Sequence, residues 1–182
     1  MHFLRGGECA DRAVYPELGA YFDDLVAVYH EELADLASVG ATYVQLDEVW
    51  LPGLCDEKIR AQARSRGDDP DHLVDLYVGL INRVVAKRPK GMTVAVHFCR
   101  GNSMGRWLAE GGYDYVAEKV FGGLEVDALF LEYDTERAGT FEPLRHVSPD
   151  KTVVLGLVST KTPQLETKRE LMGRIDQAAR YM

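Results

Sequence analysis

Hydrophobic and polar residues alternate along this chain in two recurring patterns, one typical of helices and one typical of buried strands. From Tyr21, apolar residues recur at three- and four-residue spacings as far as Gly40, which predicts an amphipathic helix. The next segment, Thr42 to Asp47, is short and rich in β-forming residues, so it predicts a strand. Further strands are expected at Met92 to Phe98, Asp127 to Leu131 and Thr152 to Val158.

Helical segments are expected between and after these strands. Asp69 suits an N-cap and Pro70 suits the first position of the helix that follows. The other expected helices are Asp56 to Arg66, Ser103 to Val120 with an interruption at Gly111-Gly112, and Glu166 to Tyr181. Strands that are apolar throughout and alternate with helices indicate a parallel sheet covered on both faces, so the class is α/β. Four such units form either an open doubly wound sheet or half of an eight-stranded barrel of TIM type.

Composition limits the classes of function. The chain has 182 residues, 46% of them hydrophobic, so we expect one domain over residues 1–182. A formal charge of -8 argues against a nucleic acid partner, which would require clustered Lys and Arg. No apolar run reaches membrane-spanning length and the first residues lack a secretory pattern, so we expect no membrane partner and a cytoplasmic location. Three cysteines, an odd number, favour free or metal-bound thiols.

Polar side chains gather where the expected strands end. They are Asp47 and Glu48, His97 and Cys99, Glu132, and Ser159 to Lys161. Barrel enzymes carry their chemistry at the C-terminal ends of strands, so this placement favours a (β/α) barrel. No glycine-rich phosphate loop follows the first strand, which weakens the nucleotide-binding alternative.

Three of these residues have the chemistry of a zinc site. His97 and Cys99 are two positions apart at a strand end, so the pleat directs both side chains to the same side. Glu132 ends the next strand, within reach of the same point. Imidazole, thiolate and carboxylate groups suit Zn²⁺. For a histidine and a cysteine alone, the alternative is a buried core cysteine beside a histidine that is hydrogen-bonded within the protein. Glu132, at the corresponding position of the next strand, favours the metal site.

The remaining polar residues suit substrate contacts. Asp47 and Glu48 face opposite ways on a regular strand, and we choose Asp47 to hold a substrate ammonium, although a salt bridge or a loop cap is an equal alternative. Arg100 and Asn102 lie in a turn that could bind a carboxylate, and a plain turn is at least as common. Lys161 is a weaker candidate, since loop lysines are usually solvated.

Four segments together resemble the C-terminal catalytic domain of the cobalamin-independent methionine synthase family. The segments are residues 43–48 (YVQLDE), 96–102 (VHFCRGN), 130–134 (FLEYD) and 154–158 (VLGLV). The resemblance implies a (β/α)₈ barrel and a zinc ion held by His97, Cys99, Glu132 and a second cysteine, whose position lies beyond Met182. It also implies that Asp47 binds the substrate amine. Lys161 stands where larger synthases carry a histidine proposed to protonate the folate leaving group.

The activity that this resemblance implies is methyl transfer from methyl-tetrahydrofolate to the thiol of homocysteine or a related thiol. A corrinoid-dependent thiol methyltransferase of the same fold is an alternative. The matching segments cover roughly the C-terminal half of a barrel, and a half-barrel exposes sheet edges and its apolar interior. We therefore expect pairing with a second copy or a missing-half partner, and an inactive assembly piece is a further alternative.

Overall fold

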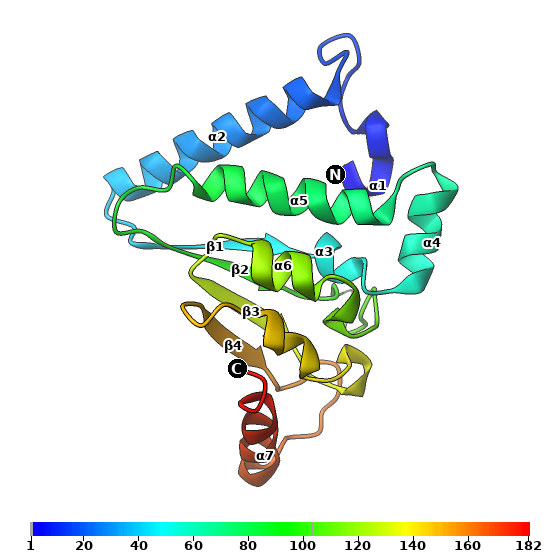
Figure 1. Cartoon of the computed structure of the whole chain (residues 1–182), viewed down its shortest axis with the longest axis vertical. Coiled ribbons are helices and arrows are strands. Elements are labelled where there is room, and N and C mark those ends of the chain that lie inside the picture. Colours follow the sequence, from blue (N-terminus) through cyan, green and yellow to red (C-terminus); the bar gives the residue numbers. More distant parts are fainter. Residues whose placement is uncertain (1, 103) are drawn as a thin grey trace.

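Four parallel strands form the centre of the structure, a computed structural model that describes residues 2–102 and 104–182. The strands are β1 (Tyr43–Glu48), β2 (Thr93–Phe98), β3 (Ala128–Glu132) and β4 (Thr152–Gly156), and they lie side by side in chain order (Figure 1). A doubly wound sheet reverses its strand order near the middle, whereas a barrel keeps consecutive strands adjacent. The sheet is therefore that of a half-barrel, as predicted.

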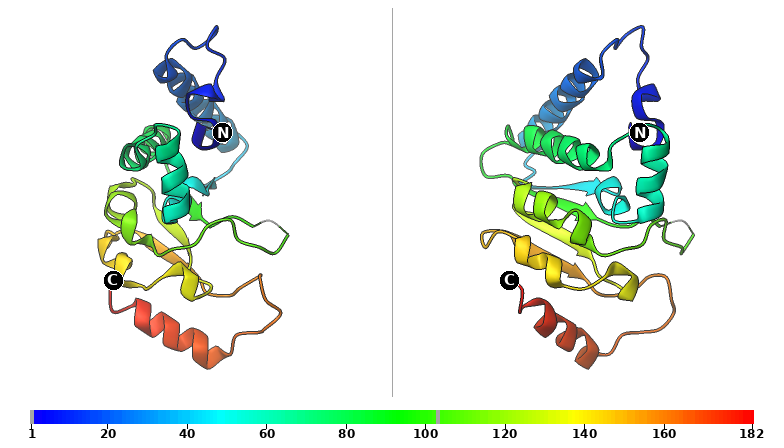
Figure 2. Two further views of the ribbon diagram at one scale, coloured as in Figure 1. Left: turned by 90° about the vertical axis from the view of Figure 1, so that its right-hand side faces the viewer. Right: turned by 45° about the vertical axis from the view of Figure 1, so that its right-hand side comes forward.

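Helices of the described residues pack mainly on one side of this sheet. α5 (Pro70–Val85) and α6 (Ala117–Gly123) cover the same face, and the loop after β2 extends on the other side (Figure 2). The remaining α-helices are α1 (His2–Arg5), α2 (Leu18–Ser38), α3 (Trp50–Gly53), α4 (Glu57–Ser65) and α7 (Lys168–Ala178). Short 3-10 helices are η1 (Gly6–Cys9), η2 (Tyr113–Tyr115), η3 (Glu136–Ala138) and η4 (Glu142–His146). Within the described residues, no helix is both long enough and apolar enough to cross a bilayer.

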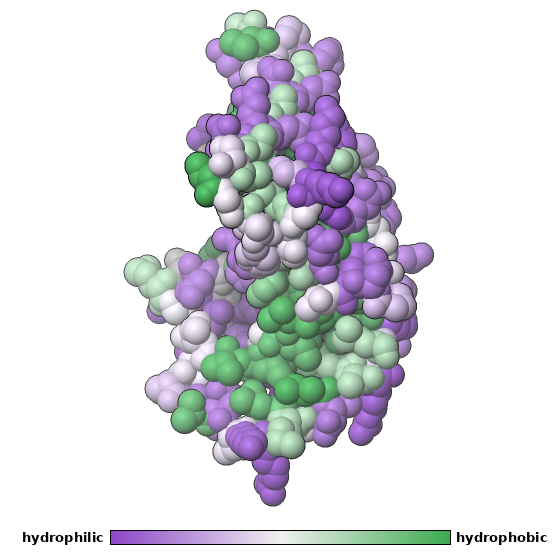
Figure 3. Space-filling view, turned by 90° about the vertical axis from the view of Figure 1, so that its left-hand side faces the viewer, coloured by the Kyte–Doolittle hydropathy of each residue, from purple (hydrophilic) through white to green (hydrophobic). Residues whose placement is uncertain are grey.

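The two faces of the sheet differ in burial. In β2, Val94, Val96 and Phe98 point to the helices and are at most 1% exposed. The pleat directs alternate residues the other way, and Val154 of β4 is 38% exposed there. Apolar side chains gather on the surface at the height of β3 and β4 (Figure 3). The expectation of helices on both faces was wrong, because the second face corresponds to a barrel interior that other strands would fill.

Local signals set the helix starts. The Asp69 side chain accepts a hydrogen bond from the backbone N–H of Asp71 at 3.0 Å, with Pro70 in the first turn, which confirms the predicted cap. Thr167 and Glu170 form a reciprocal capping box at the start of α7. These caps satisfy backbone N–H groups that have no partner within the helix.

The predicted helix from Ser103 to Val120 was wrong before Ala117, where α6 begins. Ser103 lies outside the described residues, and the segment on either side of it is a loop that leads to η2 and α6. Gly105 and Gly111 have φ values of +78° and +112°, which a right-handed helix does not allow. A Cβ at Gly111 would also lie 2.5 Å from the carbonyl oxygen of Cys55. Glycine here permits a tight approach of two loops.

Candidate active site

A cavity of about 330 Å³ opens at the C-terminal ends of β2, β3 and β4. It brings together five of the predicted site residues, namely His97, Cys99, Asn102, Glu132 and Lys161. Its other lining residues are Gly101, Phe130, Leu131, Asp134, Val154, Gly156, Val158 and Thr160. The pocket therefore lies where barrel enzymes place their chemistry.

Asp47 and His97 form a pair across neighbouring strands. The register places Asp47 directly beside His97, and Asp47 Oδ1 lies 3.2 Å from His97 Nδ1. A hydrogen bond from Gln45, together with the His97 contact, lowers the pKa of Asp47, so the carboxylate is charged at neutral pH. Its side chain is 73% exposed and that of His97 39% exposed. If His97 carries its proton on Nδ1, Nε2 remains an acceptor that could bind a metal ion.

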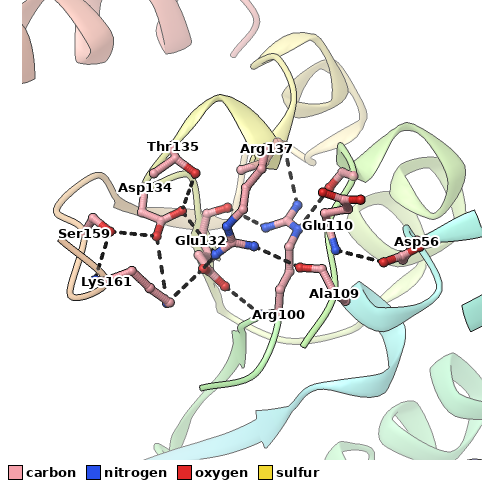
Figure 4. Close-up of polar contacts among 12 residues, drawn as sticks. Asp56, Arg100, Ala109, Glu110, Glu132, Asp134, Thr135, Arg137, Ser159 and Lys161 are labelled. Carbon is pink, nitrogen blue, oxygen red and sulfur yellow. Dashed lines mark hydrogen bonds and ion pairs between the residues drawn. The ribbon is translucent and has the colours of Figure 1, made fainter. Parts of the chain in front are cut away.

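Glu132 is the most heavily contacted carboxylate of the site (Figure 4). Its Oε2 accepts the backbone N–H of Arg100 at 2.6 Å. Its Oε1 accepts from the guanidinium of Arg137 and from Lys161 Nζ, the latter at 3.3 Å. The Glu132 side chain is only 10% exposed. A carboxylate buried to this extent needs cationic or N–H partners, and here it has three.

Asp134 extends this charged cluster. Its Oδ1 lies 3.4 Å from the guanidinium of Arg137, which also contacts Glu132. Its Oδ2 lies 3.8 Å from Lys161 Nζ and accepts a hydrogen bond from Ser159 Oγ at 3.2 Å. Two carboxylates and two cations thus lie together, each with a side chain at most 10% exposed. The formal charges cancel, which limits the cost of burying them.

Arg100 lies away from the pocket rather than in it. It is fully buried, and its guanidinium donates to the carbonyl oxygens of Gly111 at 2.9 Å and Glu132 at 2.8 Å, with its carbon 4.2 Å from the ring centre of Tyr113. It is not among the residues that line the cavity. In this arrangement Arg100 ties the loop after β2 to the end of β3.

Glu48 points to the helical side of β1, opposite to Asp47. Its carboxylate accepts from the backbone N–H groups of Trp50 and Leu51, the second at 2.9 Å, at the start of α3. Burial raises the pKa of Glu48. The choice of Asp47 over Glu48 as the residue on the His97 side therefore agrees with the structure, whereas a substrate contact for Glu48 stays a prediction.

The donor types of the pocket fit zinc, but their present arrangement does not form a metal site. An imidazole, a thiol and a carboxylate line one cavity, and this is a zinc donor set. In residues 2–102 and 104–182, however, no three His, Cys, Asp or Glu side chains form a group that could hold a metal ion. Glu132 is instead bound to Arg137 and Lys161.

Sequence reasoning missed Arg137 and Asp134. Asp134 lies two positions after Glu132, a spacing that could have indicated a shared side of the strand end. Arg137 had no comparable signal, because its contacts with Glu132 and with the carbonyl oxygen of Ala109 depend on the η3 turn.

A second cavity, of about 570 Å³, lies between α2, α5 and the outer edge of β1, where Asp47 and Glu48 contribute to its wall.

Comparison with known families decides the chain's relationship. Residues 17–182 match the family described as the cobalamin-independent synthase, catalytic domain. The chain belongs to this family. The sequence resemblance is thus confirmed, and the matched region contains every residue of the candidate site.

Three similar proteins are each more than twice as long as the part that matches this chain. YxjH of Bacillus subtilis, described as uncharacterized, is 40% identical over 97% of the chain and 47% of its own length. A methionine synthase of Pyrococcus abyssi is 28% identical over 92% of the chain and 41% of its own length. The crystal structure of a putative vitamin-B12 independent methionine synthase from Listeria monocytogenes superposes with a TM-score of 0.69 at 29% identity, covering 91% of the chain and 46% of that protein. The chain spans less than half the length of each.

Proposed function

We propose that this chain carries the thiol-activating part of a zinc-dependent methyltransferase that moves a methyl group from methyl-tetrahydrofolate to homocysteine or a related thiol. The observation that supports it is the pocket lined by His97, Cys99 and Glu132 at the ends of neighbouring strands, in a member of the cobalamin-independent synthase family. Bound zinc would supply Lewis-acid stabilisation of a substrate thiolate.

The chain's own residues supply the binding and proton-transfer groups. Asp47 presents a charged, largely exposed carboxylate that can pair with a substrate ammonium, while its contact with His97 fixes the imidazole ring. Asn102 lines the cavity that also contains His97 and Cys99, and it offers an amide to the substrate carboxylate. Lys161 carries an ammonium group at the pocket wall, from which a proton could pass to the departing folate amine.

The test combines a metal analysis with a turnover assay. Purified protein should contain zinc, and it should form methionine from homocysteine with methyl-tetrahydrofolate. Cys99→Ser should lose both properties, and Cys9→Ser, which changes a thiol outside the pocket, should keep them. Methionine formation with methylcobalamin alone would favour the corrinoid-dependent alternative. Protein without zinc and without turnover, unchanged by Cys99→Ser, would contradict the proposal.

One observation favours a second candidate, an assembly role. β1 and β4 each have an edge without a neighbouring strand among the described residues, and one face of the sheet is open. Unpaired strand edges and open apolar faces favour association with another chain. We propose that a second copy, or a partner that supplies the missing half, covers this face. Native mass spectrometry should show a dimer for the isolated chain, and a stable monomer would contradict self-pairing. A dimer without turnover would favour the assembly role over catalysis.

A further inference from the structure

Lys161 contacts Glu132 from within the pocket that also contains His97 and Cys99. Its Nζ lies 3.3 Å from Glu132 Oε1 and 3.8 Å from Asp134 Oδ2, and its side chain is 9% exposed. A cation therefore already lies beside the carboxylate that a metal ion would need. This cation belongs to the chain itself.

Arg137 reaches the same Glu132 oxygen in a different way. Its guanidinium also donates to the carbonyl oxygen of Ala109 at 3.0 Å, and its carbon lies 4.4 Å from the ring centre of Trp107. Arg137 does not line the cavity, whereas Lys161 does. Figure 4 shows the two cations approaching Glu132 from different directions. Arg137 is anchored outside the pocket, so Lys161 is the cation that shares space with a ligand.

Their positive charges prevent the Lys161 ammonium and a divalent metal ion from binding beside Glu132 at the same time. Glu132, Asp134, Arg137 and Lys161 have no net formal charge together. A divalent ion on Glu132 would add two positive charges next to the Lys161 ammonium in a poorly solvated place, where like charges repel strongly. The lysine stem is flexible and can carry the ammonium away, unlike the anchored guanidinium.

We propose that Lys161 is an internal cation that competes with zinc for Glu132, so that metal binding requires Lys161 to leave the carboxylate. This inference rests on the proposed function and adds a control of metal access at the same site. It also accounts for a pocket that has zinc donor types without a metal-binding arrangement. Lys161 acts here as a positioning residue, because it determines which partner Glu132 takes.

The test measures Zn²⁺ affinity of the full chain by competition with a chromogenic chelator. Lys161→Met should bind Zn²⁺ more tightly than wild type, on the order of tenfold to a hundredfold, because the competing charge is gone. Lys168→Met removes the same charge from an exposed position on α7 and should leave the affinity unchanged. Glu132→Gln combined with Lys161→Met should abolish the gain, since the gain acts through that carboxylate.

The outcomes separate this inference from the proposed function. Tighter binding by Lys161→Met that disappears with Glu132→Gln supports the inference. If wild type binds Zn²⁺ through Cys99 but Lys161→Met binds equally or more weakly, the competition is overturned and the zinc proposal stands. If only Lys161→Met binds Zn²⁺, the inference is supported and zinc-dependent activity of the wild-type chain is overturned. If no variant binds, both are overturned. Circular dichroism checks each fold, and Lys161→Gln replaces a variant that does not fold.

Discussion

The two sides of the candidate site differ in how their charges are held. At the ends of β3 and β4, Glu132 and Arg137 have side chains 10% and 8% exposed, within a network of ion pairs. At the ends of β1 and β2, Asp47 and His97 are 73% and 39% exposed and share one contact of 3.2 Å. Buried charges must be paired to be tolerated, whereas exposed ones can exchange partners with little cost. The charges on the β3 side are therefore held by buried ion pairs, whereas those on the β1 side remain open to solvent.

The largest effect that separates the two sides is expected from Arg137→Met. This change leaves Glu132 and Asp134 without their shared guanidinium in a buried place, which typically costs about 3–5 kcal/mol of unfolding free energy. Urea unfolding followed by circular dichroism measures it. Arg106→Met, at an exposed position of the loop after β2, is the matched control and should change stability by less than about 0.5 kcal/mol. Equal losses of unfolding free energy in the two variants would contradict the difference between the two sides of the site.

The sequence predicted the parts of this comparison that depend on local patterns. The alternation in residues 43–48 placed Asp47 and Glu48 on opposite faces of the strand, and the structure puts Asp47 on the His97 side. The Asp69-Pro70 cap was also predicted, since capping depends on a few adjacent residues.

Contacts between distant segments were beyond such patterns. The Glu132 to Lys161 pair joins residues 29 positions apart through a loop, and no periodicity records it. Arg100 was assigned to a substrate because its neighbours resemble a binding turn, yet its burial depends on carbonyl groups of other loops. The helix expected up to Val120 failed for a similar reason, because glycines fit a tertiary approach to Cys55.

A smaller effect is expected at Glu48, a half-buried carboxylate that accepts hydrogen bonds from two backbone N–H groups. Burial raises the pKa of Glu48 above its ordinary value of 4.5, so folding favours the protonated form. Wild-type stability should therefore fall, relative to Glu48→Gln, as pH rises from 4.5 through the raised pKa. Urea unfolding of both proteins from about pH 4, near the ordinary pKa of a carboxyl group, to about pH 7 measures this difference in the free energy of unfolding. A difference in unfolding free energy that stays constant with pH would show that folding does not raise the pKa of Glu48.

The smallest effect on stability is expected from Asp47→Asn. An exposed pair with histidine contributes about 0–1 kcal/mol, so the melting temperature should stay close to that of wild type. Homocysteine binding should weaken, because the carboxylate proposed to hold the substrate amine is gone. Calorimetric titration with homocysteine measures the affinity. A large loss of stability with unchanged binding would assign Asp47 to structure instead.

The central claim is that the pocket binds a metal ion through Cys99. Titration of the purified chain with Co²⁺, followed by absorption spectroscopy, tests it most directly, because a thiolate ligand gives a sulfur-to-metal charge-transfer band. Cys55 is a poor competitor, since burial raises the pKa of its thiol to about 12, and Cys9→Ser controls for the remaining thiol. We expect the band in wild type and in Cys9→Ser and its loss in Cys99→Ser. A band that survives in Cys99→Ser, or no band in wild type, would contradict the claim.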